Sequence, residues 1–279
     1  MGLAAALLFA GVGCFSISGS DRYANADRYA AGAMSYRADQ VRAVVIDWAA
    51  GNVTLKQGGD VLNVSESGGD ALDEKDRLHW WIDGTTLRIH YCASGRVTTA
   101  NKEQKHLTVE LPDFVDLDVD AASGRVLSED TLNLGKFRLD TASGGADIYG
   151  LFAKEAEIDS ASGALSFGTV SVTGAFTVDT ASGALTIEHI SANRIEAESS
   201  SGHVSIGLDS AEKVVIDTAS GNVLLKLSDP VSGARVRVDT ASGRFTSTLL
   251  HRSDGKDDVF GLGAIPVRID TASGNISIE

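Results

Sequence analysis

The chain has 279 residues and a formal net charge of −14, with 43% hydrophobic and 22% charged residues. This composition can fill a core, which excludes wholesale disorder. The acidic balance, without a cluster of Lys and Arg, excludes a nucleic-acid partner and binding to anionic lipid through a basic face. Thirty glycines, three prolines and 6% aromatic residues indicate turns of Gly and small polar residues around an aliphatic core.

The first 17 residues carry no charged side chain, so we predict that residues 1–19 form an export signal or a short membrane anchor. No basic residue precedes this run, and Arg22 and Arg28 follow it, so the topology and cleavage of the segment stay open. Lipidation of Cys14 is disfavoured, because Gly11 stands where a branched aliphatic residue is expected. Residues 20–40 are expected to be a polar tether, in which the sequence Asp-Arg-Tyr-Ala occurs twice, at 21–24 and 27–30.

A repeated corner motif dominates the rest of the chain. The pentapeptide Asp-Thr-Ala-Ser-Gly occurs five times unchanged, and near copies fill most of the intervals. From Gly124 onward its glycines follow one another at intervals of 20, 19, 20, 19, 19, 22 and 31 residues. The first and last residues of the copies form the predicted corner ladder: Asp120 and Gly124, Asp140 and Gly144, Asp159 and Gly163, Asp179 and Gly183, Glu198 and Gly202, Asp217 and Gly221, Asp239 and Gly243, Asp270 and Gly274.

The motif is flanked by period-2 alternation of apolar and polar residues, as in 176–179 before Gly183 and 184–187 after it, which indicates strand, corner, strand. About 20 residues per repeat are one coil of a parallel β-solenoid, because a single coil cannot bury its own apolar face. The glycine is expected to supply a positive φ at the corner, and Asp, Thr and Ser to bond nearby backbone N–H groups. The second corner of each coil varies in sequence, which suits either a ligand face or a neutral loop edge.

Regularity fades at both ends. We predict an N-terminal cap with degenerate coils over 41–123, with a hairpin around Asp83-Gly84, and regular coils over 124–279. The fold class is therefore all-β: a single-domain parallel β-solenoid with a β-rich N-terminal cap. Residues 250–264 insert a polar loop, and the final strand ends near Glu279, where its open edge would be blunted by the loop or would pair with a partner, including another copy of the chain.

The Val-Asp-Thr-Ala-Ser-Gly repeat following Trp81-Ile82-Asp83-Gly84-Thr85-Thr86-Leu87 resembles the bacterial β-strand-repeat domains labelled "putative adhesin", a family of unknown function. The resemblance covers about residues 40–279. It implies a right-handed β-helix-like fold, an envelope or extracellular setting behind an N-terminal membrane segment, and in some members a role in envelope-stress signalling. It implies no catalytic residues.

Stacked coils would align the motif carboxylates in a column about 5 Å apart, where like charges cost about 1 kcal/mol per pair in water. Exposure with backbone N–H bonds would relieve this, and so would a row of bound cations. Calcium requires six to eight oxygen ligands per ion, and the motif lacks the Gly-Gly-x-Gly-x-Asp loop of calcium-binding β-rolls. We therefore predict structural turn bonding and no metal site, with calcium at the column as the alternative.

Other chemistry finds little support. The six histidines lack ligand spacing, and Cys92 is most simply a packed thiol. We predict no catalytic residues and no cofactor. The leading hypothesis is a non-enzymatic envelope or surface protein that binds an unidentified extracellular ligand, a glycan or a protein, or senses the envelope, and that contacts membrane only through its N-terminal segment. The alternatives are a glycan-active β-helix enzyme, which would need a non-repeated cluster of carboxylates and basic residues, and a structural spacer or self-associating surface protein.

Overall fold

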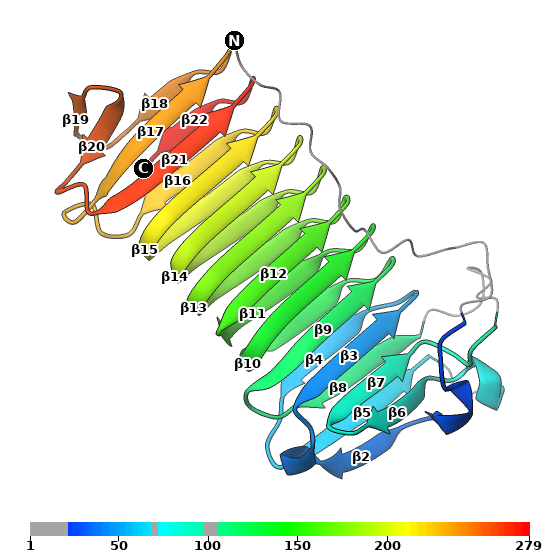
Figure 1. The fold of residues 1–279 in the computed structure, drawn as a ribbon. Coiled ribbons are helices and arrows are strands. Elements are labelled where there is room, and N and C mark those ends of the chain that lie inside the picture. Colours follow the sequence, from blue (N-terminus) through cyan, green and yellow to red (C-terminus); the bar gives the residue numbers. More distant parts are fainter. Residues whose placement is uncertain (1–21, 69–71, 97–104) are drawn as a thin grey trace.

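The computed structural model describes residues 22–68, 72–96 and 105–279. They form one 22-stranded β-sheet wound into a rod of stacked coils (Figure 1). Three single-turn 3₁₀ helices, Ala26–Arg28, Ala38–Gln40 and Glu74–Asp76, lie at the N-terminal end. The predicted parallel β-solenoid is confirmed, because the regular coils pair with their neighbours in parallel.

The rod has two long faces. The carboxylate face contains the strands that lead into the corner motif, together with the strands that pair with them at the two ends of the rod. In spatial order these are β1 (Ala30–Ala31), β6 (His79–Asp83), β7 (Thr86–His90), β3 (Ala43–Trp48), β9 (Val115–Ala121), the second half of β10 (Val126–Thr141), β12 (Glu155–Ser160), the second halves of β13 (Leu165–Thr180), β14 (Leu185–Ser199) and β15 (Val204–Thr218), then β21 (Ile265–Thr271), β17 (Ala234–Thr240), β20 (Asp257–Phe260) and β19 (His251–Asp254).

The opposite face contains the strands that leave the motif. Their order is β2 (Met34–Arg37), β5 (Val61–Ser67), β8 (His106–Leu111), β4 (Val53–Gln57), the first half of β10, β11 (Ala146–Ala153), the first halves of β13, β14 and β15, then β16 (Val223–Leu227), β22 (Ile276–Ile278) and β18 (Phe245–Ser247). The variable second corner is a bend within β10, β13, β14 and β15, marked by a shift of register in each, so these coils use one long strand where two short strands were expected.

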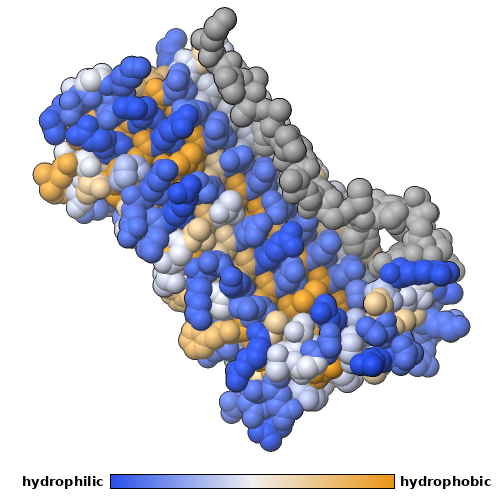
Figure 2. Space-filling model, viewed as in Figure 1, coloured by the Kyte–Doolittle hydropathy of each residue, from blue (hydrophilic) through white to orange (hydrophobic). Residues whose placement is uncertain are grey.

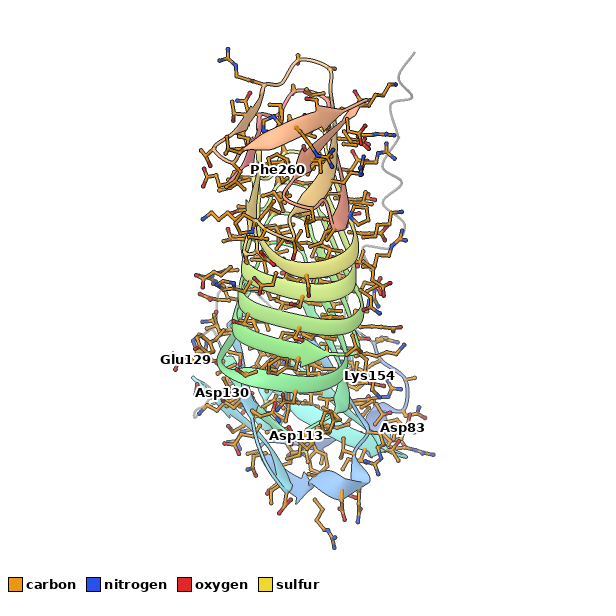
Figure 3. All side chains as sticks on the ribbon, turned by 90° about the vertical axis from the view of Figure 1, so that its left-hand side faces the viewer. Asp83, Asp113, Glu129, Asp130, Lys154 and Phe260 are labelled. Atoms are coloured by element: carbon orange, nitrogen blue, oxygen red, sulfur yellow. The ribbon has the colours of Figure 1, made fainter. Side chains whose placement is uncertain are left out.

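Alternate residues of each strand point inward and stack on the same position of the next coil. On the carboxylate face Leu139, Ile158, Val178 and Ile216 are completely buried, and their strands place them in one continuous row. Figure 3 shows side chains pointing both into the rod and outward to solvent, with Phe260, which is 1% exposed, at the C-terminal end. Full burial of one such side chain contributes about 1.5–3 kcal/mol, and each coil gains it only through its neighbours.

The chain does not stack its coils in sequence order at the C-terminal end. Strand β21 pairs with β15 on one side and with β17 on the other, and β22 lies between β16 and β18 in the same way. The last coil of the chain is thus inserted before the preceding one. The expectation that the final strand forms the open edge is wrong: the 250–264 insertion forms the β19–β20 hairpin, which pairs with residues 235–237 of β17. Strand β18 pairs on one side only, with β22, within the described residues.

The N-terminal end is interleaved as well. Strand β3 lies between β7 and β9, and β4 lies between β8 and β10. The predicted hairpin around Asp83 and Gly84 is formed by β6 and β7. Residues 22–40, expected to be a tether, fold onto the cap, because β1 pairs with β6 and β2 pairs with β5.

The predicted signal or anchor, 1–19, lies outside the described residues. Across 22–68, 72–96 and 105–279, the structure contains no helix that is long and apolar enough to span a membrane.

Candidate functional site

The corner motif is held by hydrogen bonds within a coil and between coils. The hydroxyl at its second position accepts a bond from the glycine N–H three residues later, at 3.1 Å for Thr180 and 2.8 Å for Ser199 and Thr271. The serine at its fourth position donates to a carbonyl of the adjacent coil, as Ser182 does to Ala161 at 3.2 Å. The motif therefore closes the corner and clamps one coil to the next.

The glycine of the motif allows the backbones of neighbouring coils to stack closely. A Cβ built on Gly144, Gly183 or Gly202 would lie 1.9 Å from the carbonyl oxygen of the glycine in the neighbouring coil, far inside van der Waals contact. The expected positive φ is found at Gly51, at +84°, and at none of the eight ladder glycines. Glycine is required here because two backbones meet, and not because the turn is left-handed.

The motif carboxylates form one row on the carboxylate face. Residue pairing runs in the order Asp47, Asp120, Asp140, Asp159, Asp179, Glu198, Asp217, Asp270 and Asp239. The inserted last coil thus places Asp270 between Asp217 and Asp239. Neighbours in the row are about 4.8 Å apart, the spacing of paired strands. Figure 2 shows hydrophilic residues along the length of the rod, with hydrophobic residues between them.

Burial and neighbouring carboxylates raise the pKa values along this row. The pKa of Asp120 is raised to about 7, first by burial and then by Asp47 and Asp140, while Arg138 opposes the shift. Burial is also the main cause of raised pKa values at Asp159, Asp179, Glu198 and Asp217.

Arginines two residues before the motif carboxylate relieve part of this repulsion. Arg268 forms an ion pair with Asp270, and Arg138 lies near Asp120 and Asp159. Alternate residues share a strand face. A basic residue two positions before the motif carboxylate therefore indicates an ion pair on the same face of the sheet, and this pattern was not used in the sequence analysis. The described residues contain no group of three or more His, Cys, Asp or Glu side chains that could hold a metal ion.

A pocket of about 670 Å³ lies at the N-terminal end of this row, and we call it the end pocket. Strands β3, β9 and β10 supply its floor, where Asp47, Asp118, Asp120, Arg138 and Asp140 lie. Strands β6 and β7 and residues 23–29 supply its wall. The wall contains Tyr23, Tyr29, Trp81, Asp83, Arg88 and His90.

The wall is an interlocked aromatic cluster. The Tyr23 ring stacks on the His90 imidazole, with centroids 3.9 Å apart and planes 1° apart, and Tyr29 lies 5.3 Å from the same imidazole. Trp81 meets Tyr29 edge-on at 5.6 Å and carries the Arg28 guanidinium 5.3 Å from its ring centroid. The two Asp-Arg-Tyr-Ala copies thus supply both tyrosines of the pocket.

Hydrogen bonds hold the wall in place, and one contact joins it to the floor. The Tyr23 hydroxyl donates to the Cys92 carbonyl at 3.1 Å, and the Tyr23 N–H donates to Ser94 Oγ at 3.1 Å. His90 Nδ1 lies 3.2 Å from Asp47 Oδ2. Burial raises the pKa of the Tyr29 hydroxyl, so this ring stays neutral.

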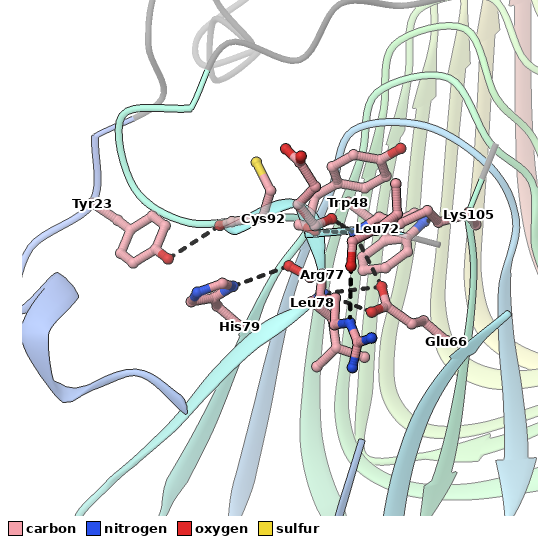
Figure 4. A network of polar contacts seen from close by, with 11 residues as sticks. Tyr23, Trp48, Glu66, Leu72, Arg77, Leu78, His79, Cys92 and Lys105 are labelled. Atoms are coloured by element: carbon pink, nitrogen blue, oxygen red, sulfur yellow. Dashed lines mark hydrogen bonds and ion pairs between the residues drawn. The ribbon is translucent and has the colours of Figure 1, made fainter. Parts of the chain in front are cut away.

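A second polar cluster is buried in the N-terminal part of the rod (Figure 4). Lys105 Nζ lies 3.0 Å from Glu66 Oε2 and donates to the carbonyls of Asp76, at 2.7 Å, and Tyr91. The Glu66 carboxylate also accepts the Leu78 N–H at 2.9 Å. Burial lowers the pKa of Lys105, and Glu66 opposes the shift. The Lys105 side chain is only 1% exposed, so this cluster is structural and cannot meet a ligand.

The ladder residues therefore lie in one row, but most of them lie outside the end pocket. Of the predicted set, Asp120 and Asp140 line it. The pocket's aromatic residues were not predicted from the sequence; the repeated Asp-Arg-Tyr-Ala was a signal for two of them. Cys92 is buried, as predicted for a packed thiol.

The fold and the corner geometry define a β-solenoid protein whose coils stack through glycine corners. The chain belongs to the Toastrack DUF4097 family, whose model matches residues 41–279.

Solved structures that are similar to this chain have low sequence identity to it. One is a putative adhesin from Parabacteroides distasonis, with a TM-score of 0.50 and 11% identity over 88% of this chain and 96% of that one. A putative adhesin from Bacteroides fragilis has a TM-score of 0.48 and 15% identity over 88% and 96% of the two chains. No curated protein matches the sequence.

Proposed function

We propose that this protein is a non-enzymatic surface or envelope module that binds a ligand in the end pocket, as an adhesin-like or envelope-sensing protein. The observation that carries the proposal is the end pocket itself. It combines the end of the repeated carboxylate row with an aromatic wall and with Asp83 and Arg88, which lie outside the corner motif. Ligand pockets commonly combine aromatic walls with a few placed polar groups.

The rod provides a rigid support for this pocket. Its continuous buried core holds the pocket at one end, away from the β19–β20 hairpin at the other (Figure 1). The envelope setting is supported by the apolar first 17 residues and by the adhesin name given to the structural neighbours. Self-association through β18 is a separate prediction, since that strand is paired on one side only within the described chain.

Retention of the labelled full-length chain on isolated envelopes of its own organism tests the proposal. We expect saturable retention that is lost in Trp81→Ala and Tyr29→Ala. Phe152→Ala is the matched control, because Phe152 is 45% exposed and lies outside the pocket. Equal retention of all variants would contradict binding through the end pocket, and turnover of envelope glycans by the purified protein would favour the enzyme alternative.

A further inference from the structure

We propose that the end pocket binds an organic cation, a ligand that carries a primary ammonium or guanidinium group, and this inference rests on the proposed function. The charges of the pocket, its aromatic wall and the spacing of its carboxylates each point to this class of ligand.

The charges of the lining are unbalanced. Five carboxylates line the pocket against two guanidinium groups. Arg88 is engaged by Asp83, with Nε 3.5 Å from Oδ2, so that pair contributes no net charge. The other charged side chains of the lining are Asp47, Asp118, Asp120, Asp140 and Arg138, so carboxylates outnumber guanidinium groups there. A cation in the pocket would reduce the repulsion between carboxylates in adjacent strands, which is strongest where they are partly desolvated.

The wall suits an organic cation. Tyr23, Tyr29 and Trp81 surround one side of the pocket, and aromatic faces attract ammonium and guanidinium groups by about 0.5–2 kcal/mol each. The Arg28 guanidinium lies 5.3 Å from the centroid of Trp81, which is the kind of contact that a bound cation would make with the other rings of the wall. The apolar part of the ligand, such as an alkyl chain, would pack on the same rings.

The floor does not suit a metal ion. Its carboxylates are spaced along paired strands at about 4.8 Å, whereas calcium needs six to eight oxygens at about 2.3–2.6 Å. No three acidic, His or Cys side chains of the described residues converge in this way. A larger organic cation can instead lie across the row and contact successive carboxylates.

The chemistry of Asp120 provides a readout specific to this ligand class. Asp120 faces Asp47 of β3, Arg138 and Asp140 of β10, and Asp118 of its own strand. Next to Asp47 lies His90 of β7, against which Tyr23 and Tyr29 pack. Because the pKa of Asp120 is raised to about 7, the pocket gains negative charge as the pH rises through 7. Cation affinity should therefore increase between pH 5.5 and pH 8, and a neutral ligand should show no such increase.

Calorimetric titration of the full-length protein with 1,5-diaminopentane tests the inference, and 1,5-pentanediol is the neutral probe of the same length. We expect the diamine to bind and the diol not to bind. We also expect affinity to fall at least tenfold in Asp118→Asn and in Trp81→Ala, and to fall with added salt. Asp147→Asn is the charge-matched control, because Asp147 lies on β11 with a side chain that is 59% exposed. Far-UV circular dichroism verifies that each variant is folded.

The outcomes separate this inference from the proposed function. Equal binding of diol and diamine, binding of a neutral sugar in preference to both, or diamine binding unaffected by Asp118→Asn would overturn the cation proposal. The cation proposal would also be overturned if retention on envelopes depends on the pocket but is not reduced by the diamine. That result would leave the proposed function in place. Diamine binding without envelope retention would support the cation site and contradict the envelope function.

Discussion

Replacing one ladder glycine by alanine should separate two coils of the rod. In Gly183→Ala the new Cβ would lie 1.9 Å from the Gly163 carbonyl oxygen and 2.8 Å from its carbon. Both atoms are backbone, so no side chain can rotate away. Opening the stack there would strain the flanking bonds from Ser182 N–H to Ala161 O, 3.1 Å, and from Leu165 N–H to Ala184 O, 2.8 Å.

We expect the free energy of unfolding to fall by about 3–5 kcal/mol, from overpacking together with the weakened hydrogen bonds. Gly59→Ala is the matched control: a Cβ at position 59 would have no atom within 4 Å, and the φ of Gly59 is not left-handed, so the change should be within about 0.5–1 kcal/mol. Urea denaturation followed by circular dichroism compares the midpoints. Equal midpoints for the two variants would refute close stacking as the reason for glycine at these corners.

Three further predictions concern the carboxylate row, the buried ion pair and the order of the coils. Since the folded-state pKa of Asp120 is raised from 3.8 to about 7, its ionisation opposes folding: the destabilisation from this one group is smallest below about pH 4 and grows as the pH rises to 7, to at most about 4 kcal/mol and to about 1–2 kcal/mol after solvent screening. Asp120→Asn should thus raise the melting temperature most at pH 8, less at pH 5 and hardly at all below about pH 3.5; parallel curves of melting temperature against pH for the variant and the unaltered protein would contradict this. Lys105→Met should cost about 3–5 kcal/mol in urea denaturation by leaving Glu66 buried and unpaired, and adding Glu66→Gln should recover part of the loss; no recovery would argue against the ion pair. In a protein whose native cysteines are replaced by serine, Val215→Cys and Arg268→Cys should form a disulfide on oxidation, because these two residues are paired neighbours on β15 and β21. A cysteine pair at the equivalent positions of β15 and β17 should not form one. The reverse result in a gel-shift assay would contradict the inserted last coil.

The sequence predicts the repeating part of the fold because a coil repeats its physical constraints. Asp179, Thr180 and Gly183 each have one local role, and a motif that recurs every 19 or 20 residues places the same role in each coil. Period-2 alternation then assigns the buried face. These signals lie within one coil and its neighbour, so they can be read without knowing the whole structure.

The order of the coils could not be predicted in this way. The copies ending at Gly243 and Gly274 have the same five residues, so either coil fits against Gly221. The structure places Gly274 there and Gly243 beyond it. What distinguishes them is the β19–β20 hairpin, which pairs with β17 and so suits the end of the rod. That contact is non-local, and a repeat motif contains no information about it.

The end pocket was unpredictable for a related reason. Tyr23, Trp81, His90 and Asp120 come from segments far apart in the sequence, and no spacing rule connects them. They meet because β3 inserts between β7 and β9 and because residues 23–29 fold back over that junction. Residues 20–40 were predicted to be a tether, because a polar segment with two tyrosines has no strong periodicity. Their contribution to the pocket was therefore not predicted.

The same stacking that makes the rod stable restricts where a specific site can form. Each interior coil has a neighbour on both sides, so its corner glycine and clamping serine are fixed by contact with backbone and cannot diverge without separating coils. Freedom to vary exists at the outward positions, at the second corners and at the two ends. At the N-terminal end, the carboxylate row meets aromatic residues that no coil supplies, and there the repeated acidic side chains become part of an unrepeated pocket. A ligand that binds in this pocket would contact only the N-terminal end of the solenoid. The number of coils on the C-terminal side of the pocket could therefore change without altering the site.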